Sequence, residues 1–373
     1  MAPISSRRNP ALDVIRCTAL LCVIAVHFFV HSSFKNTLLV GTRMYGLTVL
    51  RSASMVCVPL FLMLSGYLLN RKEPNRRYYQ KLPKTYSIYA LASLCCYCFT
   101  CYRESPDWSS FSLLQLVLKT LSFDACGYGW YMNMYWGLFL LIPFLNRLYH
   151  GLVSQKEKQG LLLVLLILTA FPKITNCFLY TSGSGWQLAV EYESHQVILP
   201  SWWTLLYPIT YYYLGAYLRE YPLKITRRQN ALLVLAAFFL TGTWNFLFSY
   251  GKEYLYGGWQ DWGSPLLVLQ SALFFQLLAQ GSYRPLQGKA AGFVAYLSDL
   301  CLGGYLVSWI FDELFYPVLL SHQPNAAYQI PYFPVIVLAV FCCSLALSAV
   351  LNWVYDLLAK CFTRIFRHKK VTV

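Results

Sequence analysis

The sequence predicts an all-α, polytopic integral membrane protein of about ten transmembrane helices, with the N and C termini cytoplasmic. Three observations support this fold class. Of the 373 residues, 57% are hydrophobic and only 12% are charged, roughly half the charged fraction of a typical soluble domain. Apolar segments long enough to cross a bilayer recur along the chain. Lys and Arg gather in alternate connections between these segments.

The apolar segments were identified by length, since a transmembrane helix needs roughly 17–25 mostly apolar residues. In chain order they cover residues 12–31, 48–70, 85–102, 130–149, 159–178, 203–220, 230–249, 263–281, 291–319 and 332–358. The connections between them are too short for a separate soluble domain. We therefore expect a single membrane-embedded domain over residues 1–373, with a basic C-terminal tail at about 359–373.

The basic residues indicate the orientation of the spans. With the N-terminus inside, the inner segments hold 22 of the 30 Lys and Arg, and the outer loops hold six. This is the positive-inside pattern. The formal net charge of +15 is therefore explained by the cations that anchor the inner side of the spans. We expect the lipid bilayer as a partner, and no nucleic acid.

The first span contains ionisable side chains at a suggestive spacing. Asn9 precedes Pro10, which is a helix-start signal, and Asp13 lies in the first turn, at the positive end of the helix dipole. Arg16 and His27 are eleven positions apart, so they lie on nearly the same helix face, roughly 16 Å apart along the axis. Arg16 is thus expected near the cytoplasmic surface, and His27 halfway or more across the membrane.

Two interpretations of this pair fit the sequence. In the first, His27 hydrogen-bonds to another helix in a purely structural role and Arg16 is an anchor at the inner surface. In the second, both residues serve a function, because an ionisable side chain within a span is costly and is retained for a reason. His27 and His31 have a metal-ligand spacing, but no carboxylate lies nearby in sequence. Cys98 and Cys101 lack a second pair that would complete a zinc site. We therefore predict no metal site.

The second span ends in small residues followed by cations. Ser65 and Gly66 allow close approach of another helix or of a ligand. Residues 71–84 form the densest basic segment of the chain. This segment is either a topological anchor or a clamp for the phosphates of a cytoplasmic, nucleotide-containing substrate.

The combined pattern resembles the membrane-bound acyltransferase family 3, and within it the surface-polysaccharide O-acetyltransferases. The resemblance follows the whole chain in order. It rests on the spacing of Asp13, Arg16 and His27, the Phe-Leu-Met-Leu-Ser-Gly-Tyr-Leu-Leu stretch at 61–69 with basic residues behind it, a span from Trp130 to a Pro at 143, the Tyr-rich segment 211–218, and residues 297–307.

The resemblance implies transfer of an acyl group, commonly acetyl, from cytoplasmic acyl-CoA to a hydroxyl of a cell-surface or lipid-linked carbohydrate. Acyl-CoA is then a co-substrate, and no bound cofactor is expected. The implied location is the cell membrane, in bacteria the cytoplasmic membrane. His27 would act as general base on the acceptor hydroxyl or carry the acyl group transiently, because an imidazole can exchange protons near neutral pH. Asp13 would position Arg16.

The acyl-CoA site that we expect combines the first two spans with the basic segment. Its residues are Arg16, Ser65, Gly66, Arg77, Lys81 and Lys84. Lys81 and Lys84 stand where the family often has an Arg-x-x-Arg pair, so the planar fork for bidentate phosphate binding is lost. In the ninth span, Ser308 stands where many members have a His, so no role of that His is carried over.

The carbohydrate acceptor is expected to contact aromatic and charged side chains on the outer side. The candidates are Arg51, Trp130, Tyr131, Glu191, Glu193 and Trp202. For each of them the alternative is an ordinary place in the aromatic belt, in a solvated loop or, for Arg51, at the membrane surface.

Two other classes of function fit a polytopic membrane protein. A transporter or flippase for a lipid-linked glycan often shows inverted repeats with interrupted helices, and residues 1–180 and 190–373 show no such correspondence. A structural or sensory subunit would make no use of the Arg16 and His27 pair.

Overall fold

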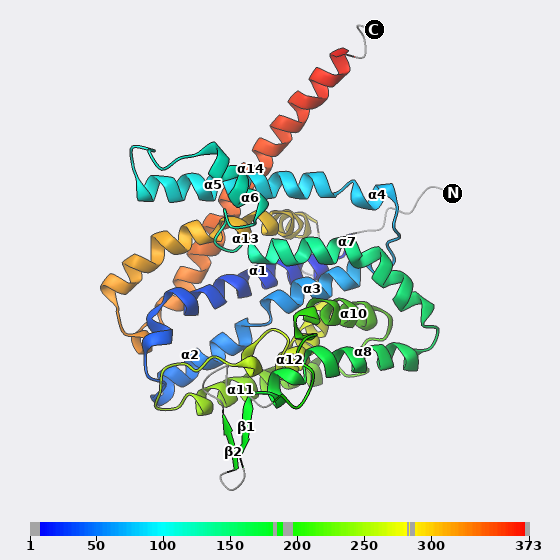
Figure 1. Cartoon of the computed structure of the whole chain (residues 1–373), viewed down its shortest axis with the longest axis vertical. Helices are drawn as coiled ribbons and strands as arrows, with labels where there is room; N and C mark the ends of the chain where they lie inside the picture. Colours follow the sequence, from blue (N-terminus) through cyan, green and yellow to red (C-terminus); the bar gives the residue numbers. More distant parts are fainter. Residues whose placement is uncertain (1–7, 182–184, 189–196, 282, 284–287, 370–373) are drawn as a thin grey trace.

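The computed structural model describes residues 8–181, 185–188, 197–281, 283 and 288–369. These residues form a bundle of helices of unequal length, and a short β-hairpin projects from one side of it (Figure 1). The end of the last helix projects away from the bundle on another side (Figure 1).

Helix α1 (Pro10–His31) is the centre of the bundle. It packs against α3 (Cys57–Leu69), α12 (Pro265–Ala279), α13 (Lys289–His322) and α14 (Tyr332–Lys369). Its buried residues are mostly apolar and lie on several of its faces, as expected for a helix enclosed by others. The predicted first span is therefore the element around which the others are arranged.

The start of α1 confirms the helix-start signal in the sequence. Asn9 has extended backbone angles, and its side-chain oxygen accepts a hydrogen bond of 3.0 Å from the backbone nitrogen of Ala11. Pro10 occupies the first helical position, where its missing N–H costs nothing. Asp13 lies in the first turn.

Helices α2 (Gly41–Ser54) and α3 together form the second apolar run, Gly41–Leu69. Helix α3 packs closely on α10 (Tyr207–Glu220) through two glycines. A Cβ atom on Gly66 would lie 1.8 Å from the backbone oxygen of a residue on α10, and one on Gly215 would lie 2.0 Å from a backbone oxygen of α3. Only glycine permits this backbone contact.

Helix α6 (Leu113–Leu121) lies beside α5 (Leu82–Glu104), where the sequence predicts an outer loop. The hydroxyl of Tyr97 accepts a hydrogen bond (3.2 Å) from the backbone nitrogen that precedes α6, and the hydroxyl of Tyr89 donates one (2.8 Å) to the carbonyl of Thr120. Helix α6 thus runs antiparallel to α5 for eight residues. Four of its five leucines are exposed, as suits side chains that face lipid.

The basic segment after α3 is held against α7 (Trp130–Gly151) by a short helix, α4 (Arg76–Tyr79). The ring of Tyr78 on α4 stacks on that of Phe139 at 4.4 Å, and its hydroxyl donates a hydrogen bond of 2.7 Å to the Phe139 carbonyl. This contact places the start of α5 near α7.

The remaining elements complete the bundle. They are α8 (Gln155–Thr169), α9 (Pro172–Thr175), the antiparallel strands β1 (Phe178–Thr181) and β2 (Gly185–Leu188), and α11 (Arg227–Phe248). Helix α11 packs on α2 and α12, and α8 packs on α10.

Within the described residues, seven helical segments are long and apolar enough to cross a membrane. They are Pro10–His31, Gly41–Leu69, Gln155–Thr175, Arg227–Phe248, Gly258–Ala279, Lys289–His322 and Tyr332–Cys361. The predicted spans at 85–102, 130–149 and 203–220 are also helical but fall outside this set. The count of about ten and the cytoplasmic side of both termini stay predictions. Most of the predicted tail, up to Lys369, continues α14.

Candidate functional site

A cavity of about 380 Å³ lies between α1, α3, α5, α7 and α13. Its walls are mainly leucine, phenylalanine and tyrosine side chains, and its cations are Arg16 and Lys81. Lys81 is the N-cap residue of α5, in the basic segment that follows the end of α3, whereas Tyr131 contacts Phe61 near the start of α3, with 5.9 Å between the rings. The cavity therefore has a cationic end and an aromatic end.

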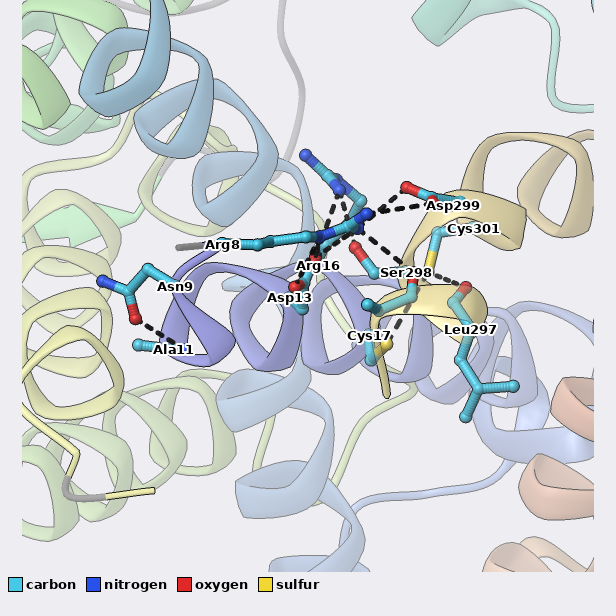
Figure 2. A network of polar contacts seen from close by, with 11 residues as sticks. Arg8, Asn9, Ala11, Asp13, Arg16, Cys17, Leu297, Ser298, Asp299 and Cys301 are labelled. Atoms are coloured by element: carbon cyan, nitrogen blue, oxygen red, sulfur yellow. Dashed lines mark hydrogen bonds and ion pairs between the residues drawn. The ribbon is translucent and has the colours of Figure 1, made fainter. Parts of the chain in front are cut away.

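Arg16 is held at the cavity by α13. Its Nη1 donates a hydrogen bond of 2.6 Å to the hydroxyl of Ser298 and lies 3.8 Å from Oδ1 of Asp13 (Figure 2). Asp13 is bound more closely by Arg8, whose Nη2 and Nε approach its two carboxylate oxygens at 2.6 and 2.8 Å. The expected contact of Asp13 with Arg16 thus exists, but it is the weaker of two.

His27 lies in a separate cluster of polar side chains. Its Nδ1 is 3.5 Å from Oδ2 of Asp312, a fully buried carboxylate on α13. Its ring stacks on that of Tyr128, with 3.7 Å between the centroids. His27 therefore contacts an acid and an aromatic ring, as an ionisable group within a membrane span requires.

Tyr128 links this cluster through its hydroxyl, which donates a hydrogen bond of 2.6 Å to Oδ2 of Asp312 and lies 2.7 Å from Nε2 of His31. A phenol has one proton, and an ionised carboxylate can only accept. When Asp312 is ionised, Nε2 of His31 must therefore carry the proton that it shares with Tyr128. The hydrogen bonds thus define a chain from His31 through Tyr128 to Asp312, with His27 beside the acid.

The backbone around Tyr128 is fixed by close contacts. The hydroxyl of Tyr305 donates a hydrogen bond of 2.5 Å to the carbonyl of Tyr128. A Cβ atom on Gly127 would lie 2.6 Å from the ring of Trp309. The segment between α6 and α7 therefore needs glycine at position 127 to pack against Trp309 of α13, and this packing places Tyr128 where it stacks on His27.

One aromatic layer separates the cavity from His27. Tyr305 lines the cavity, and its ring centroid is 6.4 Å from that of Tyr128, which in turn stacks on His27. As the described residues define it, the cavity lining includes Arg16 but not His27. Arg16 and His27, which were predicted to lie on nearly the same face of the first span, are thus separated by the rings of Tyr305 and Tyr128.

Ser65 and Gly66, adjacent in sequence, have different surroundings. Ser65 lines the cavity, and its hydroxyl donates to the carbonyl of Phe61 (2.9 Å) and lies 3.3 Å from the hydroxyl of Tyr135. Gly66 faces α10, as described above. Of the two, the structure brings only Ser65 to the cavity.

The predicted CoA-binding cations also differ in position. Lys81 lines the cavity, whereas the ammonium group of Lys84 lies 5.6 Å above the ring of Tyr355 on α14. Arg77 is exposed on α4. The structure thus brings one of the three cations to the cavity.

Arg51 lies away from the cavity, buried in α2. Its guanidinium donates a hydrogen bond to the hydroxyl of Tyr254 and lies 4.4 Å from the centroid of that ring. Burial and the nearby Arg51 cation lower the pKa of Lys35, in the connection after α1. Glu191 and Glu193, two further acceptor candidates, lie outside the described residues.

The aromatic acceptor candidates do not form one surface. Trp130 stacks on Trp262 with 4.7 Å between ring centroids, and Tyr131 lines the cavity. Trp202 is 93% exposed. The predicted acceptor site is therefore distributed over several parts of the molecule.

Sequence reasoning missed three residues of these clusters: Arg8, Tyr128 and Asp312. Asp312 had a usable signal, because it is an acid within the predicted span 291–319. Tyr128 had no such signal, because nothing in the sequence distinguishes it from the other tyrosines among the 30 of the chain. Arg8 precedes the first span and resembled an ordinary inner-side cation.

A comparison with known protein families identifies the family of this chain. A family model described as an acyltransferase domain matches residues 9–353. The match begins at the N-cap of α1 and ends within α14, so it includes the helices that line the cavity and those that carry the His27 cluster. The comparisons with curated proteins and with solved structures found no match.

Proposed function

We propose a specific reaction for this chain, which belongs to acyltransferase family 3 and is a membrane protein. The reaction is transfer of an acyl group, in our proposal acetyl, from cytoplasmic acyl-CoA to a hydroxyl of a cell-surface or lipid-linked carbohydrate. The cell membrane, in bacteria the cytoplasmic membrane, is the proposed location.

The cavity between α1, α3, α5, α7 and α13 is the observation on which the proposal rests. Acyl-CoA has an anionic, phosphate-bearing head and a long, flexible pantetheine arm that ends in the thioester. Arg16 and Lys81 provide positive charge at one end of the cavity, where they would attract the phosphates. The aromatic and aliphatic walls suit the arm, and the aromatic end lies next to the His27 cluster.

His27 is the proposed general base. It would take the proton of the acceptor hydroxyl as the oxygen attacks the thioester carbonyl. The new C–O bond forms, the C–S bond breaks, and CoA leaves as a thiolate that takes up a proton. The acyl group thus moves to the carbohydrate, and His27 returns its proton to solvent.

Asp312 would support His27 in this step. Its Oδ2 lies 3.5 Å from Nδ1 of the imidazole, where a negative charge stabilises the imidazolium that forms. Tyr128 would fix the ring plane of His27 by stacking and hold the carboxylate by its hydrogen bond. This arrangement leaves Nε2 of His27 as the nitrogen that accepts the proton.

The thioester must pass the tyrosine layer to reach His27. The cavity ends at Tyr305, whose hydroxyl is bonded to the backbone at Tyr128. We propose that binding of acyl-CoA displaces the Tyr305 side chain, which would join the cavity to the His27 cluster.

Two measurements test this function. Mass spectrometry of surface glycans would compare cells that carry the wild-type protein, His27→Ala, or His322→Ala, a control at the exposed end of α13. Calorimetry with the purified protein in nanodiscs would measure acetyl-CoA binding. We expect His27→Ala to lose glycan acylation but keep acetyl-CoA binding, and His322→Ala to keep both.

Several outcomes would contradict the proposal. Undiminished glycan acylation in His27→Ala would remove His27 from the reaction. Absence of acetyl-CoA binding in the wild-type protein would remove the co-substrate. Movement of a labelled lipid-linked sugar in CoA-free vesicles would favour a transporter.

A further inference from the structure

Arg8 is not among the described residues that line the cavity, but it binds the same carboxylate that Arg16 approaches. It donates hydrogen bonds to both carboxylate oxygens of Asp13 and to both of Asp299, the latter at 2.8 and 3.0 Å (Figure 2). It also donates one of 3.1 Å to the carbonyl of Ala295. It thus joins the start of α1 to α13 beside Arg16.

The two carboxylates that Arg8 binds have different surroundings. The Asp13 side chain is 6% exposed and that of Asp299 is 62% exposed. An exposed ion pair contributes little free energy, whereas a buried carboxylate without a cation is strongly unfavourable. The hydrogen bonds that Arg8 donates to Asp299 and Asp13 raise the pKa of Arg8 above its already high ordinary value, so Arg8 is cationic at any working pH.

Arg16 is the next cation available to Asp13. Its Nη1 lies 3.8 Å from Oδ1 of Asp13 but 2.6 Å from the Ser298 hydroxyl, so it is bonded to Ser298 and only approaches the acid. In the absence of Arg8, a rotation of the Arg16 guanidinium would bring it into direct contact with the buried carboxylate. Such a contact would satisfy Asp13 and remove the Arg16 charge from the cavity wall.

We propose that Arg8 is a positioning residue for acyl-CoA binding: it neutralises Asp13 and thereby leaves the charge of Arg16, which is bonded to the neutral Ser298 hydroxyl, available at the cavity. This inference rests on the proposed function, because it assigns the freed charge to the acyl-CoA head. It gives Asp13 a role opposite to the predicted one, since Asp13 competes for Arg16 and does not hold it in place for the substrate.

A purely structural role for Arg8 makes a different prediction. If Arg8 only fastened α1 to α13, removal of the Asp13 charge would not repair its loss. If Arg8 acts by neutralising Asp13, the double variant Arg8→Ala with Asp13→Asn should recover binding, because the neutral amide no longer attracts Arg16 as an ion.

The experiment is calorimetric binding of acetyl-CoA to the full chain in nanodiscs. The variants are Arg8→Ala, the double variant, Asp13→Asn, Arg8→Lys and a control, Lys224→Ala. The control removes one exposed cation outside the cavity lining of the described residues and so changes the net charge as Arg8→Ala does. Thermal unfolding of each variant shows whether it is folded.

We expect Arg8→Ala to raise the Kd at least about tenfold, the effect of losing one hydrogen bond from a charged group. The double variant and Asp13→Asn should bind within about threefold of wild type, as should Lys224→Ala. Arg8→Lys should bind more tightly than Arg8→Ala, since it retains the positive charge near Asp13.

Each contrary result has a distinct meaning. A double variant as weak as Arg8→Ala would show that Arg8 is only structural, and Arg8→Ala with wild-type affinity would show that it does not position Arg16. If Arg8→Ala fails to fold, the comparison of the double variant with Asp13→Asn decides instead: weaker binding in the double variant overturns the proposal. A wild-type protein that binds no acetyl-CoA would refute the proposed function itself.

Discussion

Replacement of Asp312 by Asn tests the proposed chemistry most directly. The change keeps the shape of the side chain and removes its negative charge. Asp312 is fully buried on α13, and its Oδ2 is 3.5 Å from Nδ1 of His27 and 2.6 Å from the Tyr128 hydroxyl. The carboxylate is therefore in a position to stabilise the imidazolium that forms when His27 takes up a proton.

The magnitude follows from this distance. Two unit charges at 3.5 Å attract each other by about 5 kcal/mol at an effective dielectric constant of about 20. Each 1.36 kcal/mol of a barrier corresponds to about a tenfold change in rate. Loss of the full interaction would slow transfer by about 10³–10⁴-fold, which is within the range of about 10²–10⁴ for general acid–base assistance.

The assay is the initial rate of glycan acylation at saturating acetyl-CoA, measured in membranes with equal amounts of each variant. Glu313→Gln is the matched control, because Glu313 is the next residue on α13 and pairs with Arg103 near the bundle surface. We expect Asp312→Asn to lower the rate by about 10³–10⁴-fold with little effect on acetyl-CoA binding. A rate within a few-fold of both wild type and the control would refute the reasoning.

Three further predictions concern the cavity and the helix contact behind it. Leu302→Trp adds volume to the cavity wall and should weaken acetyl-CoA binding by at least about tenfold; unchanged affinity would place the coenzyme elsewhere. Lys81→Ala should raise the KM for acetyl-CoA several-fold and Lys84→Ala much less, since only Lys81 lines the cavity; equal effects in steady-state assays would contradict this. Gly66→Ala should destabilise the protein by about 1–3 kcal/mol, because its Cβ would meet the backbone of α10. In the control Gly137→Ala the new Cβ meets no neighbouring atom, so the protein should become more stable by up to about 1 kcal/mol from helix propensity. Thermal unfolding of the two variants measures this difference.

The parts of the site that sequence reasoning predicted correctly are local. The Asn9 cap, the helix from Pro10 and the apolar run of α1 each depend on a few neighbouring residues. Arg16, Ser65 and Lys81 line one cavity, but they come from α1, α3 and the start of α5, so helix packing and not local pattern brings them together. Their role in acyl-CoA binding stays a prediction. The placement of Gly66 against α10 does not follow from local pattern either, because a small residue serves a helix contact and a ligand contact equally well.

The parts that sequence reasoning missed depend on contacts between distant segments. The acid beside His27 comes from α13, and the tyrosine that stacks on it comes from the segment before α7. The path of that segment depends on the antiparallel packing of α6 on α5. A nine-residue helix is too short to be recognised as a span, so its sequence looks like that of an outer loop.

The sequence by itself determined that this chain is a helical membrane protein, because apolar length and charge distribution are properties of short windows and of their order. Its acyltransferase type came from the resemblance of its motifs to a family, which the family model confirms. Only the tertiary structure decided which ionisable groups are neighbours: Arg8 with Asp13 and Asp299, and His27 with Asp312. Helical periodicity sets the face on which a side chain lies, but the rotation and depth of the facing helix depend on packing over the whole bundle.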